Sequence, residues 1–301
     1  MSDLCKDRVA IVTGAGRGIG RGHALSLAAA GARVVVNDLG AERDGTGAAS
    51  AGPAQEVVDE IKAMGGDAIV NGDDVSDFDA AGRMVQSAID TWGRLDIVVN
   101  NAGILRDRML TNMTEAEWDA VIKVHLKGTF GPAHHAAAYW RERAKAGETN
   151  DARLINTTSV SGIFGNPGQT NYGAAKAGIA AFTVIAAQEL GRYGVTVNAV
   201  SPGALTRMTA DLNPNRPEVK PGQFDRSAPE NIAPIVTWLA SPESHAVTGR
   251  VFIVAGGVIS VAEGWRTGPT TDKGDRWDPA ELGPVVEKLV ADAAPNTTMR
   301  G

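Results

Sequence analysis

The stretch NYGAAK at residues 171–176 places a lysine four residues after a tyrosine. A phenol in water titrates at about pH 10, so a tyrosine that exchanges protons at neutral pH needs a nearby positive charge to favour its phenolate. Residues four apart on a helix share one face, so the ammonium of Lys176 can approach Tyr172 and lower its pKa. The pattern indicates a general base or acid for a hydroxyl proton. An exposed helix with an incidental aromatic side chain is the alternative.

A serine can complete this chemistry. Ser159 ends an apolar run thirteen residues before Tyr172, where its hydroxyl can polarise a substrate oxygen and hold it near the phenol. The alternative is a capping serine, and Thr157, Thr158 and Ser161 are close rivals. The spacing favours Ser159.

A glycine-rich turn, TGAGRGIG at residues 13–20, lies between an apolar run and a helix expected to begin near Arg21. Gly14, Gly18 and Gly20 allow a tight turn and a close backbone approach to a pyrophosphate. The helix N-terminus supplies free N–H groups and positive partial charge. This context predicts a dinucleotide site.

The acidic residue expected of such a site is Asp38, eighteen residues past Gly20. Its carboxylate can accept hydrogen bonds from the adenosine ribose hydroxyls and repel a 2'-phosphate, which favours NAD over NADP. Arg17 argues mildly for NADP because a guanidinium there could reach a 2'-phosphate. A turn-forming carboxylate at a strand end is the alternative for Asp38.

Continuous apolar runs alternate with longer helical segments along the chain, as expected for parallel strands covered on both faces. The pattern predicts an α/β fold: a single doubly wound Rossmann domain whose seven-stranded parallel sheet has helices on both faces. We expect this domain to span residues 1–261, followed by a C-terminal extension over 262–301. The predicted strands are 8–14, 32–38, 67–75, 95–103, 152–159, 195–203 and 250–257.

Composition narrows the class of protein. The chain has 301 residues, 43% hydrophobic content, a formal net charge of -6 and a pI of about 5.4. It has no basic run, so we expect neither nucleic acid nor an anionic membrane as a partner. The single cysteine, Cys5, excludes an internal disulfide and a thiolate cluster for zinc, and we expect no metal. No apolar run has membrane-spanning length, and neither terminus shows a signal for secretion or the peroxisome, so the expected location is cytoplasmic.

These features together resemble a short-chain dehydrogenase/reductase. The residues that carry the resemblance are TGAGRGIG, NNAG at 100–103, Ser159, Tyr172 and Lys176, in that order, and the similarity covers about residues 6–260. The glycine spacing is typical of the compact single-domain branch. In that family the tyrosine is the base in oxidation and the acid in reduction, and the lysine also holds the nicotinamide ribose. The cationic nicotinamide ring would favour the phenolate further.

Several longer stretches resemble the (3R)-hydroxyacyl-CoA dehydrogenase units of peroxisomal multifunctional enzymes and their bacterial 17β-hydroxysteroid-dehydrogenase-like relatives. They are NDLG at 37–40 with a Gly-rich insertion, VVDEIKAMGGDA at 57–68, NNAGILRDR at 100–108, WDAVIKVHLKG at 118–128 and GNPGQTNY at 165–172. Some of these runs also resemble β-ketoacyl carrier-protein reductases. NDLG with its insertion and His125 distinguish the first group.

The remaining cofactor contacts are expected beyond the carboxyl ends of the strands. The resemblance places Asp74 on the adenine amino group, although DVSD also suits a helix N-cap, and both roles can coexist. It places NNAG along the adenosine ribose, and Leu205 with Thr206 on the nicotinamide carboxamide. The expected cofactor-binding residues are Gly14, Arg17, Gly18, Ile19, Gly20, Asp38, Leu39, Asp74, Val75, Asn101, Ala102, Gly103, Tyr172, Lys176, Leu205 and Thr206.

His125 is the fourth expected catalytic residue, with Ser159, Tyr172 and Lys176. Most relatives carry an asparagine at this position, which links the lysine to solvent through an ordered water, and the hydroxyacyl-CoA branch uses histidine. In one hypothesis His125 completes a proton path from Tyr172 and titrates near neutrality. In the other it is a buried imidazole whose hydrogen bonds are satisfied by backbone groups.

The sequence therefore predicts an NAD-dependent oxidoreductase acting on a secondary alcohol. The resemblance implies a (3R)-3-hydroxyacyl-CoA, with a steroid-derived acyl group as one form of it. The alternatives are an NADP-dependent β-ketoacyl reductase, against which Asp38 argues, and a non-catalytic nucleotide-sensing module, against which the retained catalytic residues argue.

We also expect a homodimer or homotetramer. Small and apolar residues continue around the helix predicted over 173–190, more than one buried face requires. The extension 262–301 carries Trp265 and Trp277 and a predicted helix at 279–293. It can cover the acyl pocket or clasp a second subunit; a disordered tail is the alternative.

Overall fold

The computed structural model describes residues 3–42, 44–46, 50–205, 219–220 and 222–299. A single sheet of eight strands forms its centre, in the order β3-β2-β1-β4-β5-β6-β7-β8. Every pairing from β3 to β7 is parallel, and only β8 runs antiparallel to its neighbour. The strands are β1 (Val9–Thr13), β2 (Arg33–Asn37), β3 (Ala68–Asn71), β4 (Ile97–Asn100), β5 (Ala152–Thr157), β6 (Val195–Gly203), β7 (Val251–Ala255) and β8 (Val258–Ala262).

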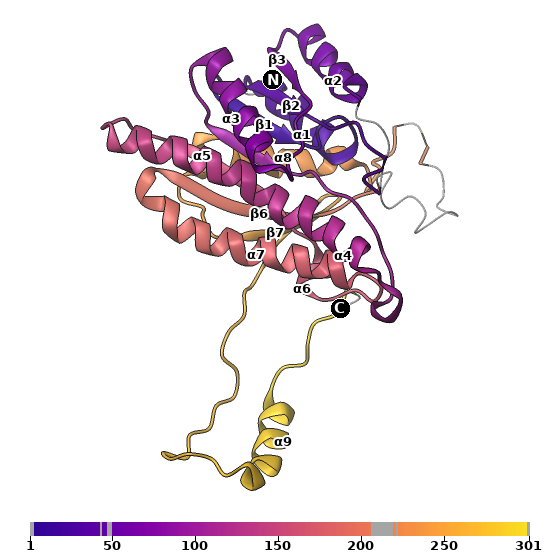
Figure 1. The fold of residues 1–301 in the computed structure, drawn as a ribbon, viewed down its shortest axis with the longest axis vertical. Coiled ribbons are helices and arrows are strands. Elements are labelled where there is room, and N and C mark those ends of the chain that lie inside the picture. Colours follow the sequence, from indigo (N-terminus) through magenta and orange to yellow (C-terminus); the bar gives the residue numbers. More distant parts are fainter. Residues whose placement is uncertain (1–2, 43, 47–49, 206–218, 221, 300–301) are drawn as a thin grey trace.

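Helices cover both faces of the sheet (Figure 1). The α-helices are α1 (Gly18–Ala29), α2 (Gly52–Ala63), α3 (Phe78–Trp92), α4 (Glu115–Ile122), α5 (Gly128–Lys145), α6 (Val160–Ile163), α7 (Thr170–Leu190), α8 (Ala233–Leu239) and α9 (Leu282–Asp292). Short 3-10 turns are η1 (Leu110–Asn112), η3 (Gly191–Tyr193), η5 (Pro229–Ile232), η6 (Pro242–Ser244) and η7 (Pro279–Glu281), and η2 (Lys123–Lys127) is a π-helical turn. None of the helices in the described ranges is long and apolar enough to cross a membrane.

The continuous apolar strands exist because the sheet has a core on each face. In β1, Ala10 and Val12 pack into the core under α1, α2 and α8, whereas Val9 and Ile11 pack into the core under α3, α5 and α7. Successive strand residues point to opposite faces, so burial on both faces requires an apolar residue at every position. The doubly wound architecture predicted from these runs is confirmed.

The predicted count of seven strands is too low by one. The run VISVA follows β7 after only Gly256 and Gly257, and Gly256 has a positive φ of 56°, which suits a tight reversal. The chain therefore turns back and β8 pairs antiparallel with β7. β8 is an exposed edge strand, with more than half of the Val258, Ile259 and Val261 side chains accessible.

The order of the strands creates the crevice in which ligands bind. The chain moves from β1 outward to β2 and β3, and then crosses back so that β4 pairs with β1 on its other side. The carboxyl ends of β1 and β4 therefore point in the same direction, while the segments that follow them diverge.

The helical segment beneath this crevice is irregular. α4 and α5 are joined without a break by the π turn Lys123–Lys127, and Pro132 lies one turn inside α5. Proline has no N–H for the helix ladder, so the helix cannot be regular there. Within this segment Gly128 packs so closely on the turn after β3 that a Cβ would lie 2.8 Å from Val75 Cγ2.

The C-terminal segment leaves the body after β8. An extended stretch leads away from the sheet to α9, and the chain then returns toward the body (Figure 1). Apolar residues of α9 recur at the spacing of one helix face: Leu282, Val285, Val286, Leu289 and Val290. Val286 and Val290 are largely exposed.

Candidate active site

A hollow of about 390 Å³ lies at the crevice between β1 and β4. It contains the predicted cofactor contacts up to Gly103, and the structure thus brings together residues from the ends of four strands. Its lining consists of Gly14, Arg17, Gly18, Ile19, Gly20, Asn37, Asp38, Leu39, Ala41, Glu42, Gly45, Asp73, Asp74, Val75, Ser76, Asn101, Ala102, Gly103, Ile104, Arg106, Ala120, Lys123 and Val124.

The glycine turn suits a pyrophosphate for steric reasons. A Cβ on Gly20 would lie 2.1 Å from the carbonyl oxygen of Gly14, and Gly14 itself has a positive φ of 61°. α1 begins at Gly18, earlier than the predicted start near Arg21, so its first free N–H groups belong to the turn itself. A helix N-terminus that opens directly from a glycine turn is a ready anion site.

Asp38 is held rigidly at the end of β2. Its Oδ2 accepts a hydrogen bond from the Gly16 N–H at 2.8 Å, and its Oδ1 accepts one from the Gly40 N–H at 2.7 Å. Each carboxylate oxygen retains a lone pair for a ribose hydroxyl. Arg17 lies on the same hollow with its side chain exposed.

The third strand is shorter than predicted. β3 ends at Asn71, so Asp74 and Val75 lie in the turn that follows and do not close the strand. Asp74 Oδ1 accepts hydrogen bonds from the N–H and the hydroxyl of Ser76, at 2.8 and 2.7 Å. The N-cap of α3 is Asp77, which accepts from the Ala80 N–H, so the alternative role of helix N-cap for Asp74 was wrong.

The predicted catalytic side chains converge at the start of α7. Lys176 is buried, its Nζ donates to the carbonyl oxygen of Thr157 at 2.6 Å, and it lies 5.6 Å from the centre of the Tyr172 ring. The Ser159 hydroxyl accepts from the Ser161 N–H at 3.2 Å, and it lies close enough to the phenol to lower the pKa of Tyr172. Ser159 therefore both caps α6 and contacts the phenol.

The rivals of Ser159 are occupied elsewhere. The Thr158 hydroxyl donates to the Lys176 carbonyl at 2.7 Å, and the Ser161 hydroxyl donates to Gln169 Oε1 at 2.8 Å. Thr157 contributes its carbonyl oxygen to the lysine. Of these hydroxyls, only that of Ser159 has a described contact with Tyr172.

The electrostatics differ from the simple expectation for Tyr172 and Lys176. Burial raises the pKa of Tyr172, and the hydrogen bond from Ser159 opposes this rise only in part. Burial also lowers the pKa of Lys176 from 10.5 to about 7. The expectation that Lys176 lowers the tyrosine pKa is therefore not met in the protein alone, because removal from water disfavours the charge on both groups.

His125 lies between the hollow and the phenol. Its Nε2 is 2.8 Å from the Ile104 carbonyl oxygen and 3.1 Å from the Ile104 N–H, and its ring meets the Tyr172 ring edge-on with the centres 5.1 Å apart. A Cβ on Gly103 would lie 2.3 Å from the imidazole, so glycine is required there. The π turn orients this side chain toward the site.

Backbone groups satisfy one nitrogen of His125, and Nδ1 has no hydrogen-bond partner within the described protein. Burial and the nearby Lys176 ammonium lower the pKa of His125 to about 3, although the bond to Ile104 opposes them. The expected titration of His125 near neutrality is therefore wrong for the protein alone, and the ring is neutral at pH 7.

Four predicted cofactor contacts are not among the residues that line the hollow. Tyr172 and Lys176 lie at the start of α7, and the other two are Leu205 and Thr206. Leu205 donates its N–H to the Ser227 carbonyl at 2.7 Å and is absent from the lining above. Thr206 lies outside the described residues. The sequence reasoning in turn missed Ile104, Arg106, Lys123 and the insertion residue Gly45, because none belongs to a glycine or strand-end pattern.

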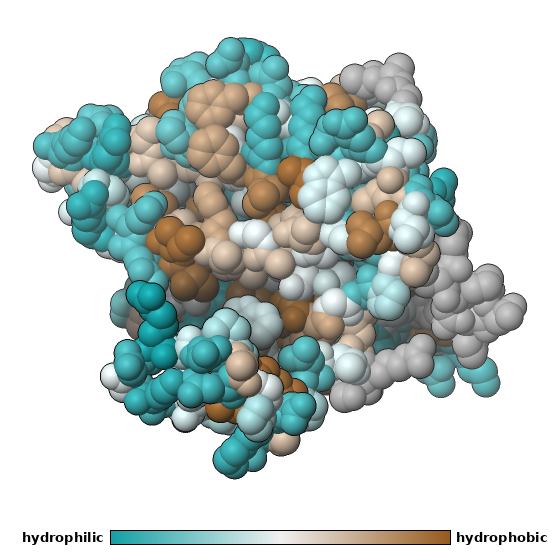
Figure 2. Space-filling view, turned by 60° about the horizontal axis from the view of Figure 1, so that its bottom comes forward, coloured by the Kyte–Doolittle hydropathy of each residue, from teal (hydrophilic) through white to brown (hydrophobic). Residues whose placement is uncertain are grey.

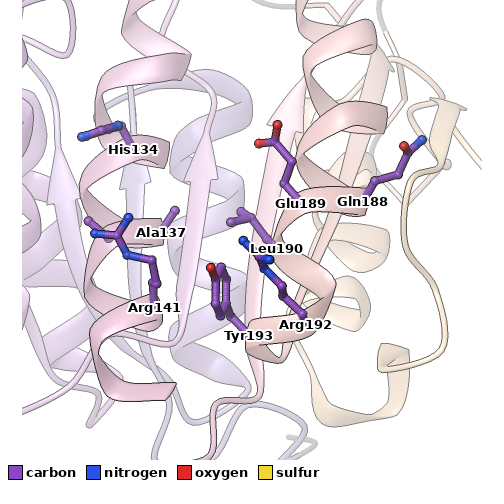
Figure 3. Close-up of a pocket in the computed structure, with 9 residues that line it drawn as sticks. His134, Ala137, Arg141, Gln188, Glu189, Leu190, Arg192 and Tyr193 are labelled. Carbon is purple, nitrogen blue, oxygen red and sulfur yellow. The ribbon is translucent and has the colours of Figure 1, made fainter. Parts of the chain in front are cut away.

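A second hollow, of about 510 Å³, lies between the C-terminal halves of α5 and α7 (Figure 3). Arg141 and His134 extend from α5, opposite Glu189 of α7 and Tyr193 beyond it. It contains none of the glycine-turn residues, which line the smaller hollow instead. The described residues include no cluster of three or more His, Cys, Asp or Glu side chains arranged to hold a metal ion.

Comparison with known proteins agrees with this geometry. A family model described as short chain dehydrogenase matches residues 8–217. Hydroxyacyl-CoA dehydrogenase ChsB1 of Mycobacterium tuberculosis is 46% identical over 96% of this chain and 90% of its own length. Peroxisomal multifunctional enzyme type 2 of Mus musculus is 41% identical over 86% of this chain, which corresponds to 33% of that protein. A crystal structure of a short chain dehydrogenase from Mycobacterium avium is 55% identical, with a TM-score of 0.88 and 98% of each chain covered.

The buried Lys176 predicts a pH dependence of stability. Its folded pKa of about 7 lies below its unfolded value of 10.5, so between these values the unfolded state binds more protons and stability rises with pH. From pH 7 to pH 9 the lysine adds about 2 kcal/mol to the free energy of unfolding. Urea unfolding of the nucleotide-free protein should show this rise, and Lys176→Met should lose it.

Lys127→Met is the control, because Lys127 is exposed on the π turn. Its pH profile should follow that of the native protein. If native protein and Lys176→Met gain equally between pH 7 and pH 9, Lys176 is ionised in the folded state and the assignment fails.

Proposed function

The chain belongs to the short-chain dehydrogenase family, and on that premise we propose that it is an NAD-dependent oxidoreductase that oxidises the secondary alcohol of a (3R)-3-hydroxyacyl-CoA, or reduces the corresponding ketone. The observation that carries the proposal is the gathering of Ser159, Tyr172 and Lys176 beside a dinucleotide-shaped crevice. A nucleotide-sensing module has no need of a buried lysine next to a buried phenol, since burying both groups disfavours their charged forms.

Each catalytic side chain has a proposed role. The Ser159 hydroxyl, which lies near enough to the phenol to lower the Tyr172 pKa, holds the substrate oxygen at Tyr172. Tyr172 accepts the hydroxyl proton in oxidation and returns it in reduction. The bound dinucleotide would supply the hydride acceptor or donor and, in its oxidised form, a positive charge. That charge favours the phenolate, which burial alone disfavours.

The substrate class follows from the relatives together with the site. ChsB1 is named a hydroxyacyl-CoA dehydrogenase, and the multifunctional enzyme aligns through a segment that covers most of this chain. The exposed side chains of Met109 and Leu110 next to the site are apolar and suit an acyl group. The proposed substrate class includes a hydroxyacyl-CoA with a steroid-derived acyl group, which is bulkier.

The decisive experiment measures oxidation of a panel of (3R)-hydroxyacyl-CoAs and 17β-hydroxysteroids with NAD⁺ and with NADP⁺. We expect the highest kcat/KM with a (3R)-hydroxyacyl-CoA and NAD⁺. Tyr172→Phe should lose at least about a thousandfold in kcat while its affinity for NADH stays within about twofold. If Tyr172→Phe turned over at the native rate, the proposed mechanism would be contradicted. A preference for NADP⁺ with a carrier-protein thioester would favour a β-ketoacyl reductase.

Cofactor choice is predicted to depend on Asp38. Its carboxylate is fixed by two backbone N–H groups where a 2'-phosphate would have to lie. One close like-charge pair is worth about 1–3 kcal/mol, so Asp38→Asn should raise the kcat/KM ratio of NADP⁺ to NAD⁺ about five- to 150-fold. Asp74→Asn, in the same hollow, is the control and should leave this ratio unchanged. A native preference for NADP⁺ would contradict the assignment.

His125 is proposed to support the proton path as a neutral hydrogen-bonding group. It contacts Ile104 through Nε2, and Nδ1, which has no partner within the described protein, can hold a water that links Lys176 to solvent. We predict that His125→Ala lowers kcat more than tenfold with little change in NAD⁺ affinity, while His125→Asn, which preserves the amide-like bonds, keeps substantial activity. Since its pKa is far below 6, the native kcat should show no step from His125 between pH 6 and 10. An unchanged kcat in His125→Ala would assign the ring to the scaffold.

We propose a homodimer or homotetramer built partly on α5 and α7. Phe130 of α5 and Val184 and Ile185 of α7 are largely exposed, and Figure 2 shows apolar side chains in a band across one face, between hydrophilic margins. The unpartnered apolar face of α9 is proposed to pack on a second copy of the chain.

Light scattering at micromolar concentration should give at least twice the 31.3 kDa mass of one chain. Ile185→Lys should reduce it, because a charge would then have to be desolvated in the interface. Lys288→Ala, on the polar side of α9, is the control and should leave the measured mass unchanged. A native mass of a single chain would contradict the assembly.

A further inference from the structure

The Gly-rich insertion after β2 contributes to the cofactor hollow through a short turn at Asp44–Thr46. The N–H and hydroxyl of Thr46 both donate to Asp44 Oδ1, at 3.0 and 2.6 Å, so the Asp44 side chain holds the turn together. Gly45 lines the hollow and has a positive φ of 83°. A Cβ there would lie 3.2 Å from Ile104 Cδ1, so the turn packs on that residue.

Arg106 joins this turn to the rest of the site. Its Nε donates to the Asp44 carbonyl oxygen at 3.0 Å across 62 residues of sequence, and its side chain lines the same hollow. A guanidinium has its donors in a fixed fork, so a bond through Nε also fixes the plane of the group. This hydrogen bond joins the insertion to the loop after β4.

The backbone around Arg106 is bound to the catalytic helix. The Arg106 carbonyl accepts from Asn171 Nδ2 at 3.0 Å, and Asn171 Oδ1 accepts from the Tyr172 N–H at 2.8 Å. Two residues earlier, the backbone of Ile104 holds the His125 ring. One loop thus contacts the insertion with a side chain and the catalytic groups with its backbone.

We propose that Arg106 is a positioning residue. Its hydrogen bond to the Asp44–Thr46 turn, which we call the latch, holds the turn against the adenosine side of the cofactor and thereby slows cofactor release. The inference rests on the proposed dinucleotide function of the same hollow. The turn and Arg106 share their hollow with Asp38 and Asp74, on the adenosine side of the crevice, so the latch stabilises binding of that half of the cofactor. Ordering the turn before the cofactor binds lowers the entropy cost of binding.

The same loop offers a matched control. Arg108 lies two residues further along and is paired with Glu117 at 3.2 Å. It does not line the cofactor hollow. A change that only loosens the loop should appear in variants of either arginine, whereas loss of the latch should appear only in those of Arg106.

Calorimetry with ADP-ribose, and stopped-flow release of NADH, test the latch without any acyl substrate. In Arg106→Ala we expect the Kd for ADP-ribose and the release rate of NADH to rise about three- to tenfold, as for loss of one hydrogen bond. Arg108→Ala should leave both unchanged. Arg106→Gln, which keeps an N–H donor, should recover part of the loss.

Asp44→Ala tests the other side of the contact with the arginine intact. It removes the acceptor that holds the turn together, so it should weaken ADP-ribose binding by a similar factor. Arg106→Ala combined with Asp44→Ala should bind ADP-ribose no more weakly than either alone, because both changes release the same turn.

Three results would each contradict the proposed role of Arg106. They are an unchanged ADP-ribose affinity in Arg106→Ala, an equal loss of affinity in Arg108→Ala, and fully additive losses in the double variant. Failure of the native protein to bind ADP-ribose or NADH would overturn both the proposed cofactor and the latch. If the native protein bound ADP-ribose and NADH normally but turned over no hydroxyacyl-CoA, only the proposed substrate would be contradicted.

Discussion

The site depends on the joint between the ends of β1 and β4. The Asn101 side chain donates to the carbonyl oxygens of Thr13 and Gly14, at 3.0 and 3.1 Å, and the Thr13 hydroxyl accepts the Asn101 N–H at 2.9 Å. Parallel strands that diverge at a crevice need such a tie, because the sheet itself provides no hydrogen bonds beyond its last residues. The glycine turn is thereby held in the conformation that only Gly20 can accommodate.

The chemistry depends on burial, which opposes the charges it needs. Tyr172 and Lys176 are removed from water together, and each loses part of its tendency to ionise. The catalytic site is therefore a place where local stability is reduced for function. The Thr157 carbonyl holds the lysine without neutralising it, which leaves the ammonium available to a ribose and to the phenol.

The loop after β4 connects parts of the site that lie far apart in the chain. It binds the His125 ring, the Asn171 amide and the turn of the insertion, using two carbonyls, one N–H and one guanidinium. Backbone contacts of this kind are insensitive to the side chains on the loop. They explain why the loop can position catalytic groups although Asp107, Arg108 and Met109 are exposed.

The sequence by itself determined most of the elements and indicated the proposed chemistry. Apolar runs predicted every parallel strand, since a strand buried on both faces must be apolar throughout, and the spacing of Tyr172 and Lys176 indicated a shared helix face. The glycine turn and Asp38 were recognisable because steric and charge requirements leave few residue types.

Tertiary structure alone decided the rest. β8 depended on a two-residue reversal, the pKa values of Tyr172, Lys176 and His125 depended on burial, and Arg106 met Asp44 only through folding. Desolvation and long-range contacts depend on what packs around a group, and no local pattern records that.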